Sequence, residues 1–72
     1  MSADEYKAAL AALGLNLAQA ARLLDVDYST SRRWGDGRTA VPPPVARFLR
    51  YLVRSGTTPS EVWAYVEESD AG

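Results

Sequence analysis

Apolar residues recur along the chain at helical spacing, in segments that are separated by short polar turns. Tyr6, Leu10 and Leu13 lie at positions i, i+4 and i+7, which places their side chains on one face of a helix. Comparable apolar faces follow in the second half of the chain. The pattern predicts one all-α domain over residues 1–72, a small five-helix bundle with helices at about residues 3–13, 17–24, 28–35, 43–54 and 59–67.

Residues that start and stop helices support these boundaries. Ser2 with Glu5, and Asn16 with Gln19, have the spacing of a capping box, in which each side chain bonds the other residue's backbone N–H. Asp27 can cap the third helix with its carboxylate. Glycines follow three of the predicted helices, at positions 14, 37 and 56, where a left-handed residue commonly ends a helix.

Prolines shape the second half of the chain. Three consecutive prolines, residues 42–44, stiffen the approach to the fourth helix, because proline fixes φ and suits a first helical turn. Thr58 and Pro59 then provide a cap and a proline at the first helical position, with Glu61 at the third. We expect this last helix to end near Glu67 and the acidic tail at residues 67–72 to fray.

The fourth and fifth helices each separate an apolar face from a polar one. The predicted core face of the fourth helix consists of Val45, Phe48, Leu49, Leu52 and Val53. Its opposite face is consistent with contacts to phosphates or with an ordinary solvated surface, and it carries Arg47, Arg50, Tyr51 and Arg54. The fifth helix has an apolar side that either closes the core or forms a dimer contact, made of Val62, Trp63 and Val66.

The third helix also divides into two faces. A step of about 100° per residue places Ser31 and Trp34 together, and we expect both to be buried, since large aromatic side chains dominate burial energetics. The opposite arc is polar and carries Ser29, Arg32, Arg33 and Asp36, at positions i, i+3, i+4 and i+7.

Residues 16–37, NLAQAARLLDVDYSTSRRWGDG, contain two short helices joined by a turn of three or four residues, which is the outline of a helix-turn-helix over about residues 17–35. This stretch resembles the Cro/repressor-like (Xre-type) helix-turn-helix family of bacterial and phage regulators. A weaker similarity extends from about residue 10 to residue 52. The family's core positions fall on Ala20, Leu24, Val26, Ser31 and Trp34, with small Ala21 facing the second of the two helices.

The chain departs from the family's pattern at three positions. Asp25 stands where glycine is usual, in a left-handed turn that Asp tolerates better than most residues. Leu17 stands where the family often has glutamine, so a phosphate contact there would be missing. Ser31 stands where Val or Ile is usual. We expect its hydroxyl to bond back to the Asp27 carbonyl, and we expect Ser31→Val to stabilise the fold.

The resemblance implies a repressor-like DNA-binding domain whose third helix enters the major groove, with its N-terminal residues reading the bases. Tyr28 fits either a phosphate or thymine-methyl contact or a role in covering the turn. Arg38 and Thr39 fit either contacts to the DNA backbone or an ordinary polar loop. The candidate DNA-binding residues are therefore Asp27, Tyr28, Ser29, Arg32, Arg33, Arg38 and Thr39. Further candidate contacts to phosphates are Asn16, Gln19 and Arg47.

Charge is distributed unevenly, although the net charge of the chain is only −1. Residues 22–54 carry seven arginines against three aspartates, for a net charge of +4. Residues 1–21 have a net charge of −1, and residues 55–72 a net charge of −4. The basic middle indicates either an anionic partner or a solvated surface from an arginine-rich proteome. Arginine favours planar, bidentate contacts to phosphate or guanine.

Missing residue types narrow the function. The chain has no cysteine and no histidine, so we expect no disulfide, no thiolate or imidazole metal site and no histidine base. No nucleophile–base pair or phosphate-cradling loop can be assembled, so we expect neither an enzyme nor a cofactor or small-molecule ligand. No apolar run reaches membrane-spanning length, and the chain does not start like a signal peptide, which favours the cytoplasm and the nucleoid.

Together these features predict a sequence-specific transcriptional regulator that binds double-stranded DNA, as a repressor or an autoregulator. Two copies, a homodimer at least on DNA, are expected on a palindromic operator, because one short recognition helix supplies little affinity. The alternative is a helical protein-interaction module of the antiactivator or antitoxin type with the same fold. Leu17, Ser31 and the acidic tail favour that alternative.

Overall fold

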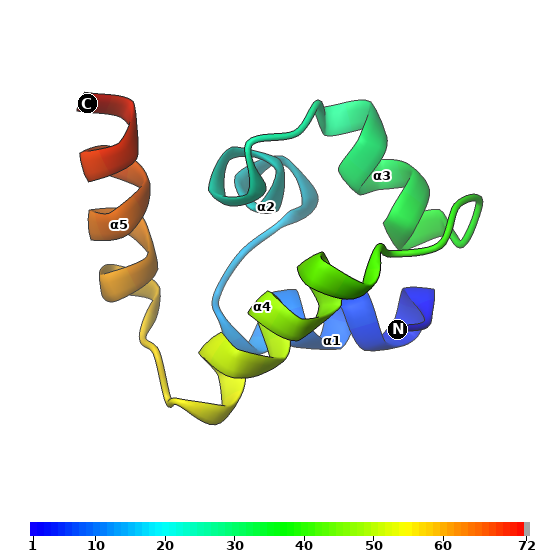
Figure 1. Ribbon diagram of the computed structural model, residues 1–72, viewed down its shortest axis with the longest axis horizontal. Helices are drawn as coiled ribbons and strands as arrows, with labels where there is room; N and C mark the ends of the chain where they lie inside the picture. The colour runs from blue at the N-terminus through cyan, green and yellow to red at the C-terminus, as the bar shows by residue number, and fades with distance from the viewer. Residues whose placement is uncertain (72) are drawn as a thin grey trace.

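The computed structural model describes residues 1–71, and it is all-helical over that range (Figure 1). Five helices fold into a compact unit with a Cα radius of gyration of 11.3 Å. The predicted all-α class and the number of helices are therefore confirmed for the described residues. The helices are α1 (Ala3–Ala12), α2 (Leu17–Leu24), α3 (Tyr28–Asp36), α4 (Pro43–Arg54) and α5 (Pro59–Ala71).

The predicted caps form at most helix ends. Both capping boxes are present, with Ser2 and Glu5 at the start of α1 and Asn16 and Gln19 at the start of α2. Asp25 ends α2 in the left-handed conformation, with φ 55° and ψ 48°. The expected carboxylate cap of α3 is wrong: Asp27 occupies the cap position, but its side chain makes no cap hydrogen bond.

The end of α5 also differs from the prediction. The helical backbone continues past Glu67 to Ala71, so the expected frayed tail is wrong over these residues, and Gly72 lies outside the described residues. No glycine or proline occurs between Pro59 and Gly72 that would stop the helix. Val66 is buried, which anchors the middle of the helix to the core.

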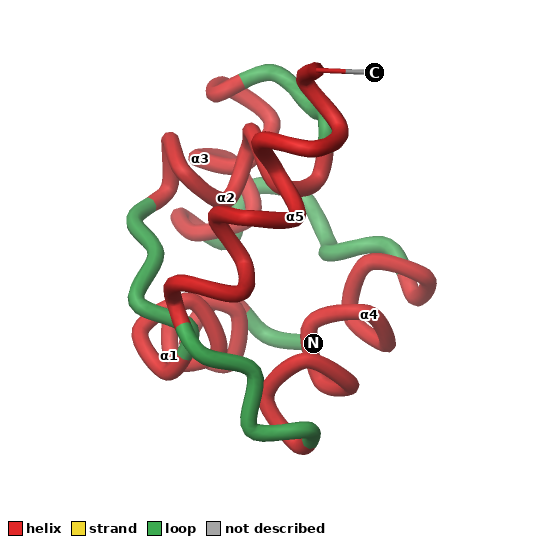
Figure 2. The backbone as a smooth tube through the Cα atoms, turned by 90° about the vertical axis from the view of Figure 1, so that its left-hand side faces the viewer, coloured by secondary structure: helices red, strands yellow, loops and turns green. Residues whose placement is uncertain are grey.

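The helices form two packed groups that share α3 and are also joined by a contact between α1 and α2. On one side α1 packs against α3 and α4, and on the other α2 packs against α3 and α5. Figure 1 shows α3 and α5 at opposite ends of the long axis of the molecule. Figure 2, from the side of α5, shows that helix crossing in front of α2. Among the described residues, α3 packs closely only against α1 and α2, so its opposite face is the more open one.

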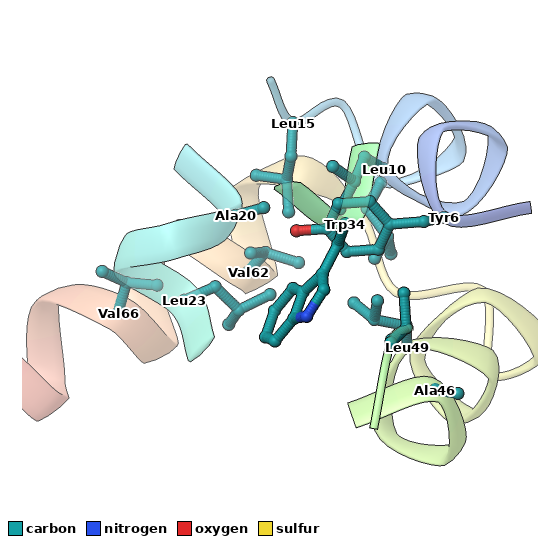
Figure 3. Close-up of a cluster of buried hydrophobic side chains, with 12 residues drawn as sticks. Tyr6, Leu10, Leu15, Ala20, Leu23, Trp34, Ala46, Leu49, Val62 and Val66 are labelled. Atoms are coloured by element: carbon teal, nitrogen blue, oxygen red, sulfur yellow. The ribbon is translucent and has the colours of Figure 1, made fainter. Parts of the chain in front are cut away.

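The core is centred on two aromatic side chains from α1 and α3 (Figure 3). The rings of Tyr6 and Trp34 meet edge to face, with centroids 5.7 Å apart and an interplanar angle of 81°. Such pairs contribute about 0.5–1.5 kcal/mol beyond the area that they bury. The apolar side of α5 closes the core, because Val62 and Val66 are buried and Trp63 packs against the cluster.

The core face of α4 is rotated from the predicted one. Leu49 is buried as expected, but the second buried position is Ala46, and Val53 is 38% exposed. Val53 lies beside a depression between α1 and α4, whose walls include Ala8, Ala9 and Ala12. Helical periodicity alone does not reveal which edge of an apolar face receives the neighbouring helix.

A buried hydrogen-bonded relay joins the first three helices. Ser31 of α3 is fully buried, and its Oγ donates to the Leu17 carbonyl oxygen of α2 at 2.8 Å. Its Oγ lies 2.6 Å from the Tyr6 hydroxyl of α1. Because the carbonyl oxygen can only accept, the Ser31 proton is committed to Leu17, and Tyr6 must donate to Ser31. Burial raises the pKa of Tyr6, which keeps the phenol protonated as this donor.

The expected bond from the Ser31 hydroxyl to the Asp27 carbonyl is therefore wrong. That carbonyl oxygen already accepts the backbone N–H groups of Thr30, at 3.0 Å, and of Ser31 itself, at 3.2 Å. The hydroxyl is left to point across the interface between helices, where it satisfies two other polar groups. No buried side-chain nitrogen or oxygen atom among the described residues lacks a partner.

Two glycines allow the chain to approach itself closely. A Cβ atom at Gly35 would lie 2.9 Å from Leu17 Cδ2, so the glycine lets α3 pack tightly on the start of α2. Gly14 has φ +71°, and a Cβ atom there would lie 2.7 Å from Pro59 Cγ. The end of α1 and the start of α5 are thereby held together.

The relay reverses the expected effect of Ser31→Val. Valine fills the space but leaves the Tyr6 hydroxyl buried without an acceptor, so we expect a loss of about 1–3 kcal/mol in the free energy of unfolding. Adding Tyr6→Phe to this variant removes the unpaired hydroxyl and should restore part of the loss. Urea denaturation followed by circular dichroism measures both changes. A single variant that is as stable as the wild type would show that the relay contributes nothing.

Candidate functional site

The outward arc of α3 is the exposed polar face that the sequence predicts. Ser29, Arg32, Arg33 and Asp36 are all exposed, whereas the inward residues Ser31, Trp34 and Gly35 are buried. The division follows from the packing of α3 against both α1 and α2, which leaves a single free side. The arc is carried by a helix whose inner face is fixed in the core, so its side chains project from a rigid support.

Five side chains gather around one shallow depression on this face, with a volume of about 320 Å³. They are Ser29, Arg32, Arg33, Asp36 and Arg38. Gly37 ends α3 with φ 78°, and the Arg38 N–H then donates to the Arg33 carbonyl oxygen at 2.9 Å. This turn folds Arg38 back beside the helix. Four of the seven predicted DNA-binding residues are therefore brought together.

The arginines of this cluster differ in what they contact. Arg32 Nε lies 3.7 Å from Asp36 Oδ2, in an ion pair between two exposed side chains one turn apart. Exposed pairs of this kind contribute little to stability, so the pair restrains Arg32 only weakly. Arg33 and Arg38 make no ion pair with any described residue. Their guanidinium groups are available for bidentate contacts to a planar or anionic acceptor.

Three further predicted residues flank the cluster. Tyr28 begins α3 and is 51% exposed, so its ring is accessible to a partner. Asp27 and Thr39 are exposed at the two ends of the segment. Across residues 25–39 the three arginines are matched by three aspartates, so the net charge of this surface segment is zero. The basic character of the middle of the chain therefore comes from residues outside it.

Asn16 and Gln19 are largely occupied by each other. Asn16 Oδ1 accepts the Gln19 N–H at 2.8 Å, and Gln19 Oε1 accepts the Asn16 N–H at 2.9 Å. These bonds use both side-chain carbonyl oxygens and leave the two amide NH₂ groups as donors. An amide that still has a free donor at a helix start can contact a phosphate, so the capping role and the predicted contact are compatible.

Arg47 belongs to a different surface. It lines a depression of about 440 Å³ on α4 together with Arg50, Tyr51 and Arg54. The predicted stripe on α4 is thus exposed as expected, but the structure does not join Arg47 to the cluster on α3.

Asp36 is the member of the α3 cluster that the predicted site omitted. The sequence did place it on the exposed arc, four residues after Arg32, and that spacing is the signal for an ion pair on a helix. Because a carboxylate repels phosphate, Asp36 was not included among the predicted contacts to DNA. Here it lies within the depression, where it modifies the charge that any partner meets.

Metal-ligand clusters and membrane-spanning helices are not found in the described part of the chain. No three carboxylate, histidine or cysteine side chains come together there in a way that could hold a metal ion. None of the helices described is long and apolar enough to cross a membrane. Comparisons of the chain with protein-family models, with curated proteins and with solved structures find no match.

Proposed function

We propose that the protein is a sequence-specific DNA-binding regulator of transcription, in which α2, the turn at residues 25–27 and α3 act as a helix-turn-helix. The observation that carries this proposal is the cluster on α3. Ser29, Arg32, Arg33 and Arg38 surround one depression on the only free side of a helix whose other sides are buried. The resemblance of residues 16–37 to the Cro/repressor-like family supports the same assignment.

In this proposal α3 lies in the major groove and its exposed side chains meet the edges of the bases. Arg32 or Arg33 donates to the O6 and N7 atoms of a guanine, and Ser29 contacts a base or a phosphate. Arg38 and Thr39, which follow the helix, contact the DNA backbone and fix the register of the helix in the groove. Asn16 and Gln19 add phosphate contacts from the start of α2 through their free amide groups.

The zero net charge of residues 25–39 has a consequence for binding. Attraction to phosphates supplies most of the non-specific affinity of DNA-binding proteins, and here it is diluted by Asp25, Asp27 and Asp36. Affinity then rests on contacts to bases and on the presence of two copies. A palindromic operator occupied by a homodimer, acting as a repressor or an autoregulator, fits this requirement.

The same zero net charge favours a second candidate, a protein-interaction module of the antiactivator or antitoxin type. A mixed array of arginines and aspartates is suited to a protein surface with both signs of charge. In that case the face of α3 binds another protein and duplex DNA does not compete. The two candidates are separated by direct measurement of DNA binding.

The proposal predicts that the protein binds a specific duplex sequence. Selection from a random duplex library with the purified protein should enrich one motif, and anisotropy should show that this motif binds more tightly than a scrambled duplex. For Z neutralised phosphates the log–log salt slope should be roughly −0.9Z. Enrichment of no motif, with equal affinity for both duplexes at moderate salt, would falsify the DNA-binding proposal and favour the protein-interaction module.

The second prediction separates reading of bases from contacts to the backbone. Arg32→Ala or Arg33→Ala should weaken binding to the selected motif by about 1–3 kcal/mol and relax the base preference at one position. Arg38→Ala should weaken binding to motif and random duplex alike and reduce the salt slope by about 1. Repeating the selection with each variant checks both outcomes. A changed motif with Arg38→Ala alone would show that α3 is not the reading element.

The third prediction concerns Asp36. Asp36→Asn removes a carboxylate from the depression and releases Arg32, so binding to random duplex should tighten by about two- to fivefold at low salt. Glu67→Gln gives the same change in net charge on α5, at the opposite end of the molecule, and serves as the control. Equal effects of the two variants in anisotropy titrations would mean that only total charge matters.

A further inference from the structure

Two exposed stripes of opposite charge lie on α4 and α5 and have the same spacing. On α4 the stripe consists of Arg47, Arg50, Tyr51 and Arg54, at positions i, i+3, i+4 and i+7. On α5 the stripe consists of Glu61, Ala64, Tyr65 and Glu68, at the same four relative positions. All eight side chains are exposed. Each stripe has charged residues at both ends and a tyrosine near its middle.

The charged residues at the ends of both stripes form no ion pair with any described residue. They are Arg47 and Arg54 on α4, and Glu61 and Glu68 on α5. Only Arg50 is paired, with its Nη2 3.6 Å from Glu5 Oε2. The Ser2 N–H, and to a smaller extent Arg50, lower the pKa of Glu5, so its carboxylate stays charged at neutral pH. The stripe on α4 therefore keeps two uncompensated arginines.

The two stripes do not meet within one molecule. The helix α5 packs against α2, and Figure 1 shows α4 and α5 running in different directions from the loop that joins them. A second copy can bring its α5 against α4 without this restriction.

An open depression with largely apolar walls lies beside the stripe on α4. This depression, of about 300 Å³ between α1 and α4, has walls that include Ala8, Ala9, Ala12 and Val53. Arg50 and Arg54 lie at its edge and belong also to the stripe. Val53 is 38% exposed at this depression, and Tyr65 on α5, 53% exposed, lines a separate depression with Phe48 and Leu52 of its own chain.

We propose that two copies of this chain associate through these stripes, with α5 of one copy lying along α4 of the other. Glutamates at the ends of one stripe pair with the arginines of the other, and Tyr65 of the second copy enters the depression between α1 and α4. Each chain carries both stripes, so the same contact can form twice in a symmetric pair. This association does not depend on the proposed DNA binding, and it uses a surface other than the cluster on α3.

A nucleic acid is the competing occupant of the arginine stripe. The observations favour a second copy, because the chain itself supplies an acidic stripe at matching spacing and has a net charge of only −1. Charge complementarity of this kind fixes the orientation of partners and makes association sensitive to salt. Exposed ion pairs are individually weak, so the pair is expected to form at high protein concentration and low salt.

Sedimentation velocity without DNA, over a range of protein and salt concentrations, tests the proposal. The wild type should form a dimer that dissociates as salt is raised. Arg47→Gln with Arg54→Gln, or Glu61→Gln with Glu68→Gln, should weaken association roughly tenfold. Lys7→Glu changes the net charge as much as the first pair does, but it lies in neither stripe, and it should leave the dimer intact. Circular dichroism confirms that each variant is folded.

A charge exchange between copies gives the sharper test. Arg47→Glu with Arg54→Glu makes both stripes acidic, and Glu61→Arg with Glu68→Arg makes both stripes basic, so each variant alone should be monomeric. Mixed in equal amounts they should form a heterodimer, because the exchanged residues at positions 47, 54, 61 and 68 then face opposite charges. A wild type that stays monomeric at low salt, or a dimer unaffected by these changes, overturns the proposal. So does a loss of duplex binding by the arginine variants with the dimer unchanged, which would assign the stripe to nucleic acid.

Discussion

The structure depends on one buried hydroxyl. Ser31 is fully enclosed, and its oxygen is the only point at which α1, α2 and α3 are tied by side-chain hydrogen bonds among the described residues. A buried polar group without partners costs about 1–3 kcal/mol, so a partly formed relay is disfavoured relative to the complete one. This requirement fixes the rotation of α3 about its axis more strictly than apolar packing does, because hydrogen bonds are directional.

The rotation of α3 links the core to the candidate site. Once Ser31 and Trp34 face inward and Gly35 lies against Leu17, the arginines at the next positions have only the outward direction left. The cluster on α3 is therefore a consequence of the core and not a separate feature of the surface. It is held by a helix with three of its residues buried, and such a support keeps side chains in place better than a loop does.

Charge gives the molecule three surfaces of different character, although its net charge is close to zero. The face of α3 has mixed charge, the outer face of α4 is basic, and the outer face of α5 is acidic. Partners respond to local fields within about 10 Å, so the balance of each surface matters more than the total. The proposed DNA contact and the proposed association of two copies use different surfaces. Both can therefore operate at the same time.

The sequence by itself determined the number of helices, most of their boundaries and most of their faces. Local signals were sufficient at the capping boxes, at Asp25 and Gly37, and along the exposed arc of α3, because caps, left-handed turns and helical periodicity act between neighbouring residues. The full length of α5 was missed, although the chain has no glycine or proline between Pro59 and Gly72 that would stop the helix.

Only the tertiary structure decided which groups meet across helices. The partners of Ser31 lie 25 and 14 residues away along the chain, and no local spacing identifies them. The same holds for Ala46 replacing Val53 in the core and for the separation of Arg47 from the cluster on α3. Periodicity gives the direction in which a side chain leaves its own helix. The position of the neighbouring helix, which sets what that side chain touches, is fixed by packing of the whole chain.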